Sequence, residues 1–219
     1  MNPPESVDRE FLKLQARRRA FQTRLLMFFA IGSTVMLVCC CIPLVILQFA
    51  FGPTVTREPT AVQAIAHEIA PLEIPAGFSG SLAKSADNSL LLVRIARFDQ
   101  SEGRGRMVIG QVHMKALQPG NEYDDKLLQS LMDELYPGLR AIDAAETRKF
   151  VVKIHDQEVT FEIVKGEDRA STTKLTQVTG TFRTSTGTNQ LLLQVESEFI
   201  TQDAIDNLLQ SLGNASDQK

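Results

Sequence analysis

The 219-residue sequence contains few of the residue types on which several protein classes depend. It has three cysteines, all side by side at positions 39–41, no tryptophan and two tyrosines. Three adjacent cysteines exclude a disulfide-rich scaffold. The scarcity of aromatic residues leaves few platforms on which sugars or single-stranded nucleic acids could stack. Together with a sequence pI of about 5.7, these shortages predict no nucleic-acid partner.

Charge is absent from residues 25–51, which read LLMFFAIGSTVMLVCCCIPLVILQFAF. At a rise of about 1.5 Å per residue, the part from Leu25 to Leu47 would form a helix of about 35 Å. Such a helix is long enough to cross a bilayer core of ~30 Å, whereas buried core helices have shorter apolar runs. The sequence therefore predicts a transmembrane helix at 25–51, with the lipid bilayer as a partner.

The charges that flank this segment predict its orientation. Residues 1–24 form a basic tail with six cations and three acids, and the cations nearest the apolar segment are Arg17, Arg18, Arg19 and Arg24. The positive-inside rule then places the N-terminus in the cytoplasm and exports the rest of a single-pass cell-membrane protein.

Two alternatives to this topology exist. A cleaved signal peptide has an apolar region of ~7–15 residues and small residues before its cleavage site. The segment is longer, and Gln48 is too large for the −3 position of a cut after Ala50. An uncleaved signal anchor is therefore the better interpretation. The other alternative, a tethered domain that faces the cytoplasm, stays open.

The remaining sequence predicts one α+β domain. Residues 52–59 are interpreted as a linker, 60–213 as the exported domain and 214–219 as a disordered tail. Amphipathic helices are predicted after caps at Thr60, Asn121 and Thr201. Strands are predicted at 91–96, 107–115, 150–154, 159–163, 174–183 and 190–199. About six strands, mostly in hairpins, with three helices indicate an antiparallel sheet.

The order of these elements resembles that of a known fold. Residues 75–212, which finish in a strand and an amphipathic helix ending Gln210-Ser211-Leu212, resemble the α/β/α sandwich of the PsbP/Mog1-like proteins. That resemblance implies a non-catalytic binding or assembly factor. The apolar N-terminal segment departs from both families.

Three strings resemble catalytic or phosphate-binding motifs without completing them. HEIAP at 67–71 begins like the zinc-protease motif H-E-x-x-H, but Pro71 replaces the second histidine. Ser81 and Lys84 match S-x-x-K, in which the lysine activates the serine one turn away, but no K-T-G is present. The turn Gly103-Arg104-Gly105 lacks the GK[ST] of a phosphate-binding loop. We therefore predict no catalytic residue and leave the role of Ser81 and Lys84 open.

The candidate metal ligands are isolated or badly spaced. His113 and His155 fall on predicted strands without a second histidine at ligand spacing. Cys39–Cys41 point about 100° apart on a helix and cannot converge on one ion, so they are interpreted as apolar fillers. Asp124 and Asp125 stand at the start of a predicted helix, where acidic residues favour the macrodipole. The sequence predicts neither a metal nor a cofactor.

These observations favour an exported, non-catalytic interaction or ligand-binding module on a membrane anchor. Its specificity and any protein partner at the membrane are not determined by the sequence. A membrane-tethered hydrolase with an unrecognised active site is the alternative function.

Overall fold

The computed structural model describes residues 27, 53–136 and 138–213. The chain divides between Gly52 and Pro53. Within the described residues, no helix is long and apolar enough to cross a membrane. The predicted fold class, which included a transmembrane helix, is therefore wrong for the part that the structure describes.

Several predictions concern residues outside that part. Only Met27 of the predicted span at 25–51 is described. The topology arginines Arg17, Arg18, Arg19 and Arg24, the cysteines at 39–41 and the tail at 214–219 also lie outside the described residues.

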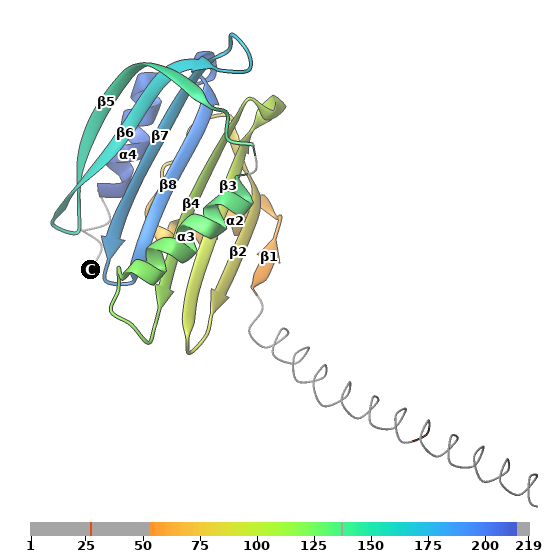
Figure 1. Ribbon diagram of the computed structural model, residues 1–219, viewed down its shortest axis with the longest axis vertical. Helices are drawn as coiled ribbons and strands as arrows, with labels where there is room; N and C mark the ends of the chain where they lie inside the picture. Colours follow the sequence, from red (N-terminus) through yellow and green to blue (C-terminus); the bar gives the residue numbers. More distant parts are fainter. Residues whose placement is uncertain (1–26, 28–52, 137, 214–219) are drawn as a thin grey trace, which may run out of the picture. The chain divides into compact units, whose positions relative to one another are not determined.

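The described fold is one antiparallel sheet of eight strands with three α-helices (Figure 1). The strands are β1 (Thr54–Thr56), β2 (Phe78–Asp87), β3 (Leu91–Gln100), β4 (Gly105–Met114), β5 (Ile142–Ile154), β6 (Gln157–Asp168), β7 (Lys174–Thr184) and β8 (Gly187–Glu196). The helices are α2 (Pro59–Ile69), α3 (Glu122–Leu135) and α4 (Gln202–Gly213), with short 3₁₀ turns at η1 (Ser101–Gly103) and η2 (Ser197–Phe199).

The prediction of about six strands is corrected to eight, because β1 and β2 were missed. The sequence of β2, FSGSLAKSAD, is rich in small and polar residues and lacks the alternation of large apolar side chains that marks a half-buried strand. β1 has three residues and lies in the segment interpreted as a linker. Pairing with neighbouring strands, rather than local hydrophobicity, defines both elements.

The strand order β1-β2-β3-β4-β8-β7-β6-β5 consists of two meanders joined in the middle. The first meander contains β1 to β4 and the second contains β5 to β8. Between them, β4 pairs with β8 from Gly105 opposite Val195 to Val112 opposite Thr188. Because α3 follows β4 and precedes β5, it carries the chain from the centre of the sheet to its far edge.

Helices cover both faces of the sheet (Figure 1). On one face, α2 and α4 pack over a core that includes Phe98, Phe161 and Leu193. On the other face, α3 places Leu128 and Met132 against the centre of the sheet. β8 lies between the two cores, and Leu191 to Val195 are all buried. Gln194 is one of them, and only 3% of it is exposed.

Two of the three predicted N-terminal helix caps are present in the structure. The Asn121 side chain accepts hydrogen bonds from the backbone N–H groups of Tyr123 and Asp124, which confirms the predicted cap of α3. The Thr201 hydroxyl likewise accepts from the N–H of Ala204 at the start of α4. Helix α2 differs, because Pro59 occupies its first turn and Thr60 is already helical. Proline suits that position, where no intrahelical N–H is needed.

Candidate functional site

The structure separates the two residues of the S-x-x-K match. Ser81 and Lys84 lie on β2, an extended strand, rather than on one helical turn. The Ser81 hydroxyl donates to the backbone oxygen of Arg97, and the Lys84 ammonium pairs with Glu134 at 2.6 Å. A β-bulge interrupts the pairing of β2 with β3 between Gly80 and Leu82, and the two side chains have separate partners. This arrangement does not place the lysine where it could activate the serine.

His67 and Glu68, from the incomplete zinc motif, both lie on α2. His67 lies in the last turn of α2, and Glu68 forms a 2.8 Å ion pair with Arg94 on β3. His155, predicted on a strand, instead lies with Asp156 in the β5–β6 turn, where both residues have positive φ. Among the described residues, no group of three histidine, cysteine or acidic side chains is arranged to hold a metal ion.

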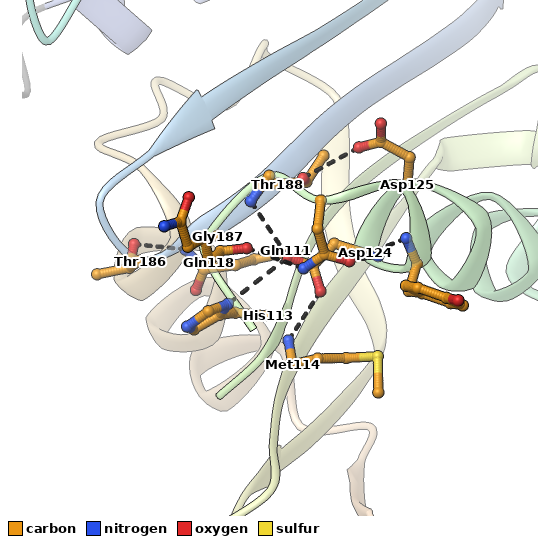
Figure 2. Close-up of polar contacts among 12 residues, drawn as sticks. Gln111, His113, Met114, Gln118, Asp124, Asp125, Thr186, Gly187 and Thr188 are labelled. Atoms are coloured by element: carbon orange, nitrogen blue, oxygen red, sulfur yellow. Dashed lines mark hydrogen bonds and ion pairs between the residues drawn. The ribbon is translucent and has the colours of Figure 1, made fainter. Parts of the chain in front are cut away.

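A buried polar cluster forms where β4 leads into α3 (Figure 2). The Asp124 side chain is fully buried and accepts hydrogen bonds from the N–H groups of Met114 at 2.8 Å and Gly120 at 3.2 Å. Nδ1 of His113 lies 3.5 Å from the same carboxylate. The interpretation of Asp124 as a residue that only favours the helix dipole is therefore incomplete, because it also holds the β4–α3 loop closed.

Neighbouring contacts extend this cluster to the β7–β8 turn. The Asp125 carboxylate accepts from the Thr188 hydroxyl at 3.1 Å and from Arg183 at 2.9 Å. The Gln111 amide donates to the Thr186 hydroxyl at 2.9 Å, and Figure 2 shows this contact and that of Asp125 with Thr188. The cluster's contacts join α3 to both central strands, so we assign it a structural role.

We expect Asp124→Ala to lower the free energy of unfolding by about 2–4 kcal/mol, because it leaves two backbone N–H groups without their acceptor. Asp125→Ala is the matched control. Its carboxylate is 40% exposed, and removing an exposed pair costs about 1 kcal/mol or less. Denaturant unfolding of both variants measures the difference, and equal losses would contradict the structural role of Asp124.

A different polar site lies at the opposite end of β3 and β4. It is a pocket of about 400 Å³ whose walls include three arginines, Arg97 on β3, Arg106 on β4 and Arg140 between α3 and β5. We call it the arginine pocket. The exposed fractions of these three side chains are 22%, 25% and 33%. The other lining residues are Asp99, Gln100, Gly103, Gly105, Tyr136, Gly138 and Gln194.

Asp99 orients two of the arginines. Its carboxylate accepts from Nε and Nη2 of Arg97, at 2.7–3.1 Å, and from Nε of Arg106 at 2.7 Å. Burial alone would raise the pKa of Asp99, but hydrogen bonds from Arg97, Ser81 and Arg106 outweigh it and hold the pKa below its ordinary value. The carboxylate is therefore ionised at neutral pH and fixes both guanidinium groups.

Tyr136 also lines the arginine pocket. Its hydroxyl is within hydrogen-bonding distance of the backbone oxygens of Arg106 (3.3 Å) and Gln194 (3.4 Å). The guanidinium of Arg106 stands over its ring, 5.4 Å from the centroid. Burial raises the pKa of Tyr136, and the charges of Arg106, Arg140 and Arg97 oppose that rise. Tyr136 is therefore a neutral hydrogen-bond donor at the base of the pocket.

Gln194 fixes the third arginine. Its side-chain oxygen accepts from the backbone N–H of Arg140 at 2.9 Å, and its amide donates to the backbone oxygen of Arg140 at 2.8 Å. The Arg140 guanidinium reaches Glu196 at 3.2 Å and Asp168 at 3.9 Å. The loop after α3 is thereby attached to the end of β8.

Sequence reasoning missed the arginine pocket, because its charged residues come from separate segments. In the sequence, Gly103-Arg104-Gly105 indicates only a turn, and Arg97, Arg106 and Arg140 form no motif. One local signal was available, since Arg97 and Asp99 alternate in a strand and must share a face. Their convergence with Arg140 depends on the pairing of β4 with β8.

The ion pairs of Asp99 predict a pH dependence of stability. Since its pKa is lower in the folded protein, the ionised carboxylate stabilises the fold at pH values above its ordinary pKa of 3.8. That contribution is lost as the pH falls through the lowered value. At pH 7 we expect Asp99→Asn to reduce the free energy of unfolding by about 1–2 kcal/mol.

The difference between wild type and Asp99→Asn should shrink below pH 3.8. Denaturant unfolding across the pH range measures it, with Asp203→Asn, a change of an exposed carboxylate in α4, as control. A difference that stays constant down to pH 2 would show that the ion pairs contribute nothing.

Comparison with known proteins adds no family to this description. No protein-family model matches the chain, and no curated protein shows significant sequence similarity to it. The fold and the arginine pocket therefore define the chain's class only as an α+β protein with a basic pocket at one end of its sheet.

Proposed function

We propose that the domain formed by residues 53–213 is a non-catalytic ligand-binding module, and that its ligand is an anionic small molecule held in the arginine pocket. The observation that carries this proposal is the convergence of three guanidinium groups on a pocket whose walls contain one carboxylate, Asp99. The remaining polar contacts orient those groups and leave the cavity open.

Several features of the arginine pocket support an anionic ligand. Its volume of about 400 Å³ lies in the range of ~300–1,000 Å³ that is typical of small-molecule sites. Guanidinium groups donate but do not accept hydrogen bonds, and they are suited to paired contacts with carboxylate or phosphate oxygens. The part of the chain beyond residue 51 carries 17 cations and 23 acids, so three arginines around one cavity form a local exception to the charge of the domain.

The contacts of Ser81 favour this proposal over the alternative hydrolase. Its hydroxyl contacts Arg97 and lies in range of Asp99, beside the arginine pocket, without the lysine that could deprotonate it. Ser81 therefore supports the wall of the arginine pocket through Arg97 and Asp99.

Thermal unfolding of the full chain tests the proposal. Citrate, inorganic phosphate and the cation spermidine would each be compared with sodium chloride at matched ionic strength. We expect at least one of the two anions to raise the Tm of the wild type and spermidine to leave it unchanged, because a ligand that binds only the folded state stabilises it by mass action.

The shift in Tm caused by the anion should fall to zero or nearly so in Arg140→Gln, which removes one guanidinium. Arg140→Lys is the second variant, because it keeps the charge near Glu196 while losing the guanidinium fork. The readout is the ligand-induced shift, so a change in basal Tm does not affect it. No shift with either anion, or equal shifts in wild type and both variants, would overturn the proposal.

A further inference from the structure

Resting on the proposed function, we propose that the arginine pocket recognises a phosphate group, a tetrahedral oxyanion carried by a small molecule. The first argument concerns the positions of the three arginines in the fold. Arg97, Arg106 and Arg140 belong to three different segments. A carboxylate presents two oxygens in one plane, whereas a phosphate group presents three oxygens in different directions and can engage guanidinium groups from three sides.

The second argument concerns the N–H donors of the guanidinium groups that their acidic partners do not engage. Asp99 engages Nε and Nη2 of Arg97, which leaves the two N–H donors of Nη1 outside this pair. Glu196 engages Nη1 and Nη2 of Arg140 through one oxygen, which leaves the Nε donor outside that pair. The acidic partners thus hold the arginines in place while retaining donors for a ligand.

The third argument is charge. The residues that line the arginine pocket contain three guanidinium groups and one carboxylate, an excess of two positive charges, and Glu196 and Asp168 pair with Arg140 from outside the lining. A phosphate monoester carries about −1.5 to −2 at neutral pH. A monocarboxylate would neutralise less of this excess. The charge of the lining residues therefore favours a phosphate group over a monocarboxylate.

The fourth argument is space. Gly103, Gly105 and Gly138 line the arginine pocket, and the positive φ of Gly103 (71°) and Gly138 (90°) favours glycine at both positions. A pocket of about 400 Å³ holds more than a bare ion, so the phosphate would be one end of a larger molecule. The turn at 103–105 contributes by leaving room beside the arginines, and not as the phosphate-binding loop that its sequence fails to match.

Isothermal titration of the full chain tests this inference, with inorganic phosphate, sulfate and succinate as probes at pH 7.5 and equal ionic strength. Sulfate shares the tetrahedral shape of phosphate, and succinate carries two negative charges on planar groups. We expect phosphate and sulfate to bind at least tenfold more tightly than succinate. Because guanidinium geometry matters, we expect Arg97→Lys and Arg106→Lys each to weaken phosphate binding at least tenfold.

Arg183→Gln is the matched control. Arg183 pairs with Asp125 at the opposite end of the sheet, so phosphate affinity should remain within twofold of the wild type. Phosphate binding that all pocket variants retain would place the ion elsewhere and overturn the inference. Tighter binding of succinate that is lost in Arg97→Lys would overturn the phosphate specificity but keep the proposed function. Binding of none of the three probes would contradict both.

Discussion

The pairing of β4 with β8 is the interaction on which the rest of the structure depends. It joins the two meanders, and it places Arg106 directly opposite Gln194 and Val112 directly opposite Thr188. Both strands are buried between helices on the two faces of the sheet. A register shift of one residue would turn each side chain to the other face. The hydrophobic pattern of this central pair therefore fixes the polar groups at its two ends.

These two ends have different properties. At one end, the buried Asp124 accepts backbone N–H groups and attaches the start of α3 to β4. At the other end, Gln194 attaches the chain after α3 to β8 and positions Arg140 beside Arg106. The first cluster consists of contacts between its own residues. The second surrounds an open pocket with donors, which is why we assign structure to one and ligand binding to the other.

The sequence predicted the elements that carry their own local signals. Asn121 and Thr201 cap helices as expected, and the strands predicted in the second meander overlap the observed ones, although β5 and β6 extend well beyond the predicted 150–154 and 159–163. It failed for β2, whose small and polar residues become a strand only by pairing with β3. The arginine pocket was not predicted for the same reason, because no local pattern reports that Arg97 and Arg140 meet across a pair of strands distant in sequence.

The central claim is that an oxyanion binds between these arginines, and anomalous diffraction tests it most directly. Crystals of the protein soaked in selenate, a tetrahedral analogue of phosphate with a strong anomalous scatterer, would locate the ion without assumption. We predict a peak inside the arginine pocket, within hydrogen-bonding distance of guanidinium nitrogens of at least two of Arg97, Arg106 and Arg140. An empty arginine pocket, with selenate at other surface cations, would contradict the claim.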